Sequence, residues 1–108
     1  MDKFEHVSLN LERTLALANL LTACEKHNVE VKEVFYYQNG FQVMFEGTEG
    51  DAILHDGSYG KDFCMWETYK FPWDYDDVSV HDAETLAKMI GALQRGEDWE
   101  VYQNGGEN

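Results

Sequence analysis

The chain has 108 residues, of which 21 are acidic and 8 are basic, so its formal net charge is -13. This charge excludes direct binding of nucleic acid, because proteins that grip nucleic acid neutralise its phosphates with lysine and arginine. The hydrophobic fraction of 44% and the aromatic fraction of 14% exclude a disordered acidic segment and indicate a folded core.

The first predicted element is a helix over about residues 8–27. Leu17, Leu20, Leu21 and Cys24 follow the i, i+3, i+4, i+7 spacing of residues on one helical face. This spacing predicts an amphipathic helix whose apolar side covers the core.

A β-hairpin is predicted after this helix. Residues 29–38 combine alternating apolar and charged positions with a run of aromatic residues, which favours a strand. Asn39-Gly40 follows, and this dipeptide between two strand-like runs is the strongest short hairpin signal in a sequence. Residues 41–47 alternate again and are the predicted return strand.

Two further strands are predicted in the middle of the chain. The apolar run at residues 52–55 is followed by the turn sequence DGSYG at residues 56–60. Residues 62–71 are the predicted fourth strand, because large apolar side chains alternate along them.

The last predicted element is a second helix. Ser79 to Asp82 fits the capping-box pattern of a helix start. Arg95 and Gly96 fit a helix end, with a cation in the last turn followed by a C-capping glycine. The apolar stripe between these signals consists of Ala83, Leu86, Ala87, Ile90 and Leu93.

These elements predict one α+β domain over residues 1–108, with residues 103–108 as a flexible tail. The short turns imply antiparallel pairing of neighbouring strands. We therefore expect a four-stranded antiparallel meander flanked by an N-terminal and a C-terminal helix (αββββα) in two layers, one face of the sheet lying under the helices.

The two cysteines, Cys24 and Cys64, lie 40 residues apart, and the chain has no CxxC motif. Each lies within an apolar pattern, so we interpret both as buried free thiols. A single Cys24–Cys64 disulfide is the alternative.

No motif for catalysis, metal binding or phosphate binding is present in the sequence. The chain has no HExxH, GxSxG, GxGxxG or Walker-type motif. Asp74-x-Asp76 begins like a calcium loop, but Val78 and the lack of a following glycine break the pattern. We expect a protein that is not an enzyme and that uses no cofactor or metal.

The acidic residues are unevenly distributed along the chain. Residues 1–45 hold six acids and four bases, whereas residues 46–108 hold fifteen acids and four bases. Carboxylates at i and i+2 of a strand are about 6.8 Å apart, which resembles the charge spacing of a stretched nucleic-acid strand. Arginine forms charge-assisted hydrogen bonds with carboxylates as it does with phosphates, so we expect a basic protein as partner.

Aromatic residues lie among these acids, and tyrosine and tryptophan are favoured as hot spots at protein interfaces. An acidic domain with no such partner is the alternative, because net charge alone keeps many proteins in solution. The predicted partner-binding acids are Glu46, Glu49, Asp51, Asp56, Asp62, Asp74, Asp76, Asp77, Glu97 and Asp98. The predicted anchors are Trp73, Tyr75 and Trp99.

The end of the chain carries a resemblance to a known family. The helix ETLAKMIGALQRG runs into the acidic and aromatic tail EDWEVYQ. With its size, acidity and composition, the chain resembles small acidic phage-encoded anti-CRISPR proteins of the DNA-mimic type. The resemblance implies that the partner is a CRISPR effector nuclease. It also implies that the bound protein blocks the site at which this nuclease reads duplex DNA or holds its guide RNA.

The sequence thus predicts a non-enzymatic acidic inhibitor that binds the basic nucleic-acid-binding surface of a CRISPR effector or other defence nuclease. One alternative is an immunity-type antitoxin that plugs a basic nuclease toxin. Another is a self-associating acidic structural domain, which would form a homodimer. We therefore expect the protein to be either a monomer or a homodimer. The start of the chain lacks the apolar run of a signal peptide, and no stretch is long enough to span a membrane. We expect a cytoplasmic protein, in the host cytoplasm if it is phage-encoded.

Overall fold

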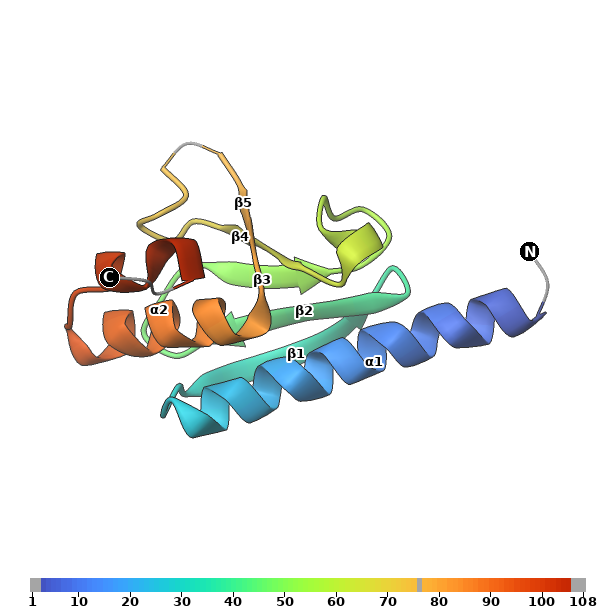
Figure 1. The fold of residues 1–108 in the computed structure, drawn as a ribbon, viewed down its shortest axis with the longest axis horizontal. Helices are drawn as coiled ribbons and strands as arrows, with labels where there is room; N and C mark the ends of the chain where they lie inside the picture. The colour runs from blue at the N-terminus through green and yellow to red at the C-terminus, as the bar shows by residue number, and fades with distance from the viewer. Residues whose placement is uncertain (1–2, 76, 106–108) are drawn as a thin grey trace.

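The computed structural model describes residues 3–75 and 77–105 and consists of two α-helices, two 3-10 helices and a single β-sheet (Figure 1). The α-helices are α1 (Lys3–Lys26) and α2 (Ala83–Arg95), and the 3-10 helices are η1 (Lys61–Phe63) and η2 (Glu100–Gly105). The strands are β1 (Val31–Tyr37), β2 (Gly40–Phe45), β3 (Asp51–Leu54), β4 (Trp66–Tyr69) and β5 (Ser79–His81).

The sheet is antiparallel with the strand order β1-β2-β3-β4-β5, which confirms the α+β class. The predicted number of four strands was wrong, because β5 adds a fifth. Ser79 lies in β5 opposite Thr68 instead of starting a helix. Asp82 is the N-cap of α2, and its side chain accepts a hydrogen bond from the Thr85 amide. Three residues are too few to show strand periodicity, so the sequence alone favoured the capping box.

The core lies between the sheet and the two helices, which cover the same face of the sheet (Figure 1). Val43, Ala52 and Thr68 stand opposite one another on β2, β3 and β4, and all three are fully buried. Leu20 of α1 and Ile90 of α2 belong to the same core and are fully buried as well.

Among residues 3–75 and 77–105, no α-helix covers the other face of the sheet. The register places Phe35, Gln42, Ile53, Glu67 and Val80 in one row across the five strands of this face. Phe35 and Val80 are exposed, whereas Glu67 is buried and accepts a hydrogen bond from the Tyr59 amide. We call this surface the open sheet face.

The predicted hairpin is confirmed, but its turn is one residue earlier than Asn39-Gly40. Gln38 and Asn39 are the two turn residues, with φ angles of 48° and 57°. Gly40 is the first residue of β2, and a Cβ there would lie 2.0 Å from the Leu54 carbonyl oxygen. The glycine therefore serves the close approach of β2 to β3 and not the turn itself.

The other predicted boundaries agree with the structure to different degrees. Gly96 caps α2 with a φ of 72°, as predicted. The strand predicted at residues 62–71 is shorter, because η1 and Cys64, with a φ of 52°, precede β4. The 3-10 helix η2 continues to Gly105, so it includes part of the segment predicted as a tail.

Candidate functional site

One end of the molecule gathers acidic residues from four separate segments. The pairing of Asp51 with Tyr69 places the start of β3 beside the end of β4. The β2–β3 turn and the β4–β5 loop therefore share this end, and Gly50 lies against the Phe71 ring. The start of β1 and the end of α2 lie at the same end, on the left in Figure 1. We call this surface the acidic end, and its exposed carboxylates are Glu30, Glu46, Glu49, Asp77, Glu97 and Asp98.

Gln94 of α2 holds two of these segments together. Its side-chain Nε2 donates to the Glu30 carbonyl at 2.8 Å and to the Glu46 carbonyl at 2.9 Å. Its Oε1 accepts from the Glu30 amide at 2.8 Å. The backbone below Glu30 and Glu46 is therefore fixed, while both side chains remain exposed to solvent.

The acidic end is only partly neutralised by basic residues. Arg95 Nε lies 3.2 Å from Glu97 Oε1, in an exposed ion pair. Lys70 is exposed in the β4–β5 loop. Within residues 3–75 and 77–105, neither Glu46 nor Glu49 takes part in an ion pair. The carboxylates of the β2–β3 turn are thus available to an external cation.

Two predicted partner-binding acids lie outside the acidic end. Asp56 and Asp62 lie in the β3–β4 connection, at the opposite end of β3. Asp56 Oδ1 accepts from Arg13 Nη1 at 2.6 Å, and this hydrogen bond lowers the pKa of Asp56 below 3.8. Asp51 accepts from Gln42 Nε2 at 2.6 Å, and Asp76 is outside the described residues.

Trp73 and Asp74 are engaged in packing inside the protein, so we remove both from the proposed contact set. The Trp73 side chain is 5% exposed and is stacked on Phe71 with ring centroids 4.7 Å apart. Trp99, a half-buried ring, meets it edge to face at 5.4 Å, and the His81 ring does so at 6.2 Å. By contrast, Tyr75 is 84% exposed, so it stays in the proposed contact set.

The Asp74 carboxylate organises the β4–β5 loop from within. The side chain is 4% exposed and accepts hydrogen bonds from Thr68 Oγ1 at 3.0 Å and the Phe71 amide at 3.3 Å. It also accepts from Ser79 Oγ. Trp73 Nε1 donates to Thr68 Oγ1 at 3.1 Å and joins the same network. Asp74 therefore links β4, the loop and β5.

Asp74, Ser79 and His81 together form a group that sequence reasoning missed. His81 Nε2 lies 2.7 Å from Ser79 Oγ, and burial lowers the pKa of His81 below 6.5. A catalytic serine gives its hydroxyl proton to histidine. Here Ser79 donates to Asp74, so the proton points away from His81, which suits a structural network. The Ser-x-His spacing on one strand is the signal that could have revealed it.

The two cysteines are free, so no Cys24–Cys64 disulfide forms. Cys24 is buried as predicted, and burial raises the pKa of its thiol to about 11. Cys64 is half-buried beside η1.

We expect DTNB to modify one thiol of the folded protein readily, at Cys64, and the second only after unfolding. The thiolate is the reactive form, and the raised pKa of Cys24 suppresses it. The measurement is the number of thiols released with and without denaturant, and Cys64→Ser should remove the fast reaction. Two thiols of equal rate in the folded wild type would contradict the assignment.

Residues 3–75 and 77–105 contain no group of three His, Cys, Asp or Glu side chains placed to hold a metal ion. None of their helices has the length and apolar character needed to cross a membrane. Comparisons of the chain with protein-family models, with curated proteins and with solved structures found no match.

Proposed function

We propose that this protein is a non-enzymatic inhibitor that binds a basic nucleic-acid-binding surface of another protein through its acidic end. The partner we propose is a CRISPR effector or another defence nuclease, whose access to DNA or RNA the bound inhibitor blocks. The observation that supports this most is the gathering of Glu46, Glu49, Glu97 and Asp98 at one end.

The physical argument is one of charge and rigidity. A groove that holds nucleic acid presents arginine and lysine side chains, which bind carboxylates and phosphates by similar charge-assisted hydrogen bonds. Carboxylates on a fixed backbone lose less freedom on binding than those on a flexible tail. Gln94 provides such a fixed backbone below Glu46. Tyr75, which is 84% exposed, adds an aromatic contact at the same end.

The experiment compares two double variants that change the net charge equally. Glu46→Lys/Glu49→Lys reverses the acidic end, and Glu12→Lys/Asp62→Lys reverses two exposed acids elsewhere. We expect the first pair to weaken binding of the target nuclease by about 100-fold, because facing like charges cost several kcal/mol and 1.4 kcal/mol is tenfold. The control pair should weaken binding far less.

The measurement begins with recovery of the target from host lysate on the immobilised protein at low salt. Binding of the purified target is then measured with and without its DNA or RNA substrate. We expect mutual exclusion and loss of affinity with salt, since the screening length is about 8 Å at physiological ionic strength. A target that binds the inhibitor and its substrate simultaneously would refute blocking. An immunity-type role would be identified by a nuclease toxin as target.

Self-association is the second candidate, and the open sheet face favours it. Phe35, Tyr37, Tyr69 and Val80 expose 42%, 53%, 47% and 39% of their surface, and β1 is an edge strand. A second copy that covers this face would give a homodimer. Light scattering of the purified protein distinguishes the two candidates, because a strict monomer removes self-association.

A further inference from the structure

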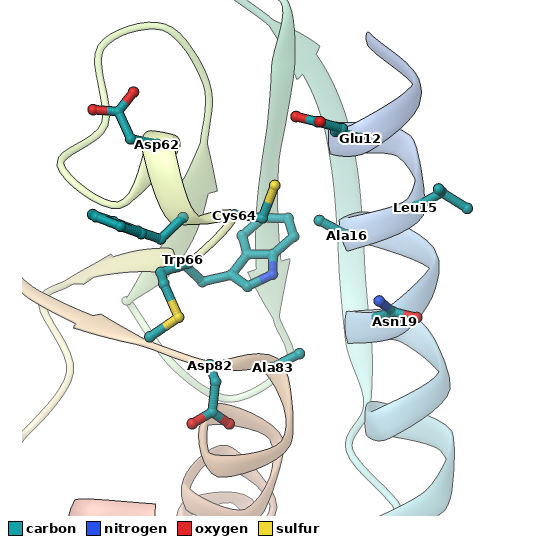
Figure 2. Close-up of a pocket in the computed structure, with 11 residues that line it drawn as sticks. Glu12, Leu15, Ala16, Asn19, Asp62, Cys64, Trp66, Asp82 and Ala83 are labelled. Atoms are coloured by element: carbon teal, nitrogen blue, oxygen red, sulfur yellow. The ribbon is translucent and has the colours of Figure 1, made fainter. Parts of the chain in front are cut away.

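A groove of about 650 Å³ lies between α1, the η1–β4 connection and the start of α2 (Figure 2). Glu12, Leu15, Ala16 and Asn19 line it from α1. Asp62 to Trp66 and the pair Asp82-Ala83 line it from the other two segments. The groove shares no residue with the acidic end, so an inference about it does not rest on the proposed function.

The Trp66 indole is the most informative group of this groove. The residue is fully buried, yet its Nε1–H has no hydrogen-bond acceptor among the described residues. Figure 2 shows the indole nitrogen turned toward α1, on the side of Ala16 and Asn19. The large majority of buried donors in native structures have an acceptor, and Trp73 Nε1 follows this rule with Thr68. The Trp66 N–H therefore indicates a missing acceptor.

The groove offers a path by which an acceptor can reach this nitrogen. Asn19 is exposed, so its side chain can turn without disturbing the core. Ala16 points from α1 toward Trp66 (Figure 2), and Phe63, which is 82% exposed, adds apolar surface from the η1 side of the groove. A ligand with an aliphatic part would cover these side chains while its acceptor points inward.

The charge around the groove is negative. Glu12 and Asp62 are exposed, and no ion pair within residues 3–75 and 77–105 engages either one. Asp82 is already bonded to the amide and hydroxyl of Thr85, but its negative charge remains. The nearby Lys61 Nζ donates to the Asp56 carbonyl, 2.8 Å away. The ligand that complements this groove is therefore a cation that also carries a hydrogen-bond acceptor.

We propose that this groove binds a lysine or arginine residue of a peptide. Its main-chain carbonyl accepts from Trp66 Nε1, its aliphatic stem lies between Ala16 and Phe63, and its charged head group lies between Glu12 and Asp62. One such residue supplies all three parts, because long basic side chains cover apolar surface while their charge stays near solvent.

The probe for this proposal is N-acetyl-arginine methylamide, titrated into the intact protein while the three tryptophan indole N–H signals are followed by NMR. We expect the Trp66 signal to shift downfield and saturate, with a Kd of about 1 mM, while the Trp73 and Trp99 signals stay in place. No movement of the Trp66 signal up to about 10 mM, tenfold above that Kd, would overturn the proposal.

Two matched ligands and one variant separate the parts of the proposal. The citrulline analogue keeps the carbonyls but is neutral, and agmatine keeps the guanidinium but lacks the main-chain carbonyl. We expect each of these two ligands to bind the wild-type protein at least about tenfold more weakly than N-acetyl-arginine methylamide does. We expect N-acetyl-arginine methylamide itself to bind the Glu12→Gln/Asp62→Asn variant more weakly than the wild type by the same factor. If the citrulline analogue bound as tightly as the arginine probe, or if the variant bound that probe as tightly as the wild type does, charge would not select the ligand. Either result would overturn the proposal.

Discussion

An Asp74→Ala variant is expected to lose about 3 kcal/mol of unfolding free energy, because hydrogen bonds to a charged group contribute about 1.5–3 kcal/mol each and are not additive. The buried carboxylate accepts from Thr68, Phe71 and Ser79, so its removal leaves donors of three segments without their partner. Urea unfolding measures this loss of free energy. The slope of the unfolding free energy against urea concentration should be the same as for the wild type, because an unchanged slope shows that the folded and unfolded states keep their compactness.

The matched control is Asp77→Ala in the same loop. Asp77 is exposed, and its Oδ1 accepts from the adjacent Val78 amide at 2.8 Å. We expect this variant to stay within about 0.5 kcal/mol of the wild type, as most surface substitutions do. Equal stability of the two variants would contradict the structural role of Asp74. Because Asp74 supports the fold, its substitution cannot test the acidic end.

An Arg13→Ala variant is expected to lose a similar amount, about 3 kcal/mol, because it removes charge-assisted hydrogen bonds together with a buried side chain. Arg13 is 4% exposed and ties α1 to two turns of the sheet. Its Nη1 donates to Asp56 Oδ1 and to the Asn39 carbonyl, each at 2.6 Å. The melting temperature should fall by more than about 10 °C for a domain of this size.

Lys26→Ala provides the control for Arg13→Ala. Lys26 is an exposed base of the same helix whose Nζ lies 3.2 Å from Glu84 Oε1. Such surface pairs contribute at most about 1 kcal/mol, so this variant should melt close to the wild type. If the two variants melted together, Arg13 would not be the link between α1 and the turns.

The Arg13–Asp56 pair also has a consequence for acid stability. The hydrogen bond from Arg13 lowers the pKa of Asp56 below 3.8, so the unfolded chain binds the proton more readily than the folded one. The stabilisation is therefore complete above pH 3.8 and is lost as the pH falls through the folded pKa. Asp56→Ala should lack this part of the acid dependence.

Much of the fold follows from local pattern. The apolar spacing of the two helices, the cap at Gly96 and the hairpin at Asn39 each depend on neighbouring residues and are readable from the chain itself. The antiparallel order also follows, since short connections leave consecutive strands side by side. The excess of carboxylates after residue 45 is also readable from the chain itself, and the basic partner inferred from it stays a prediction.

The sequence by itself thus determined the α+β class, the two helices, the hairpin and the acidity of the second part of the chain. Only the tertiary structure decided that β5 forms and that Asp74 is buried while Glu46 and Glu49 are exposed. It also decided that the Trp66 indole meets no acceptor within the described part of the chain. Acidic side chains of similar chemistry are buried at one position and exposed at another, because their burial depends on which turns lie together at an end of the sheet. That arrangement is set by contacts between residues distant in sequence, which no local pattern contains.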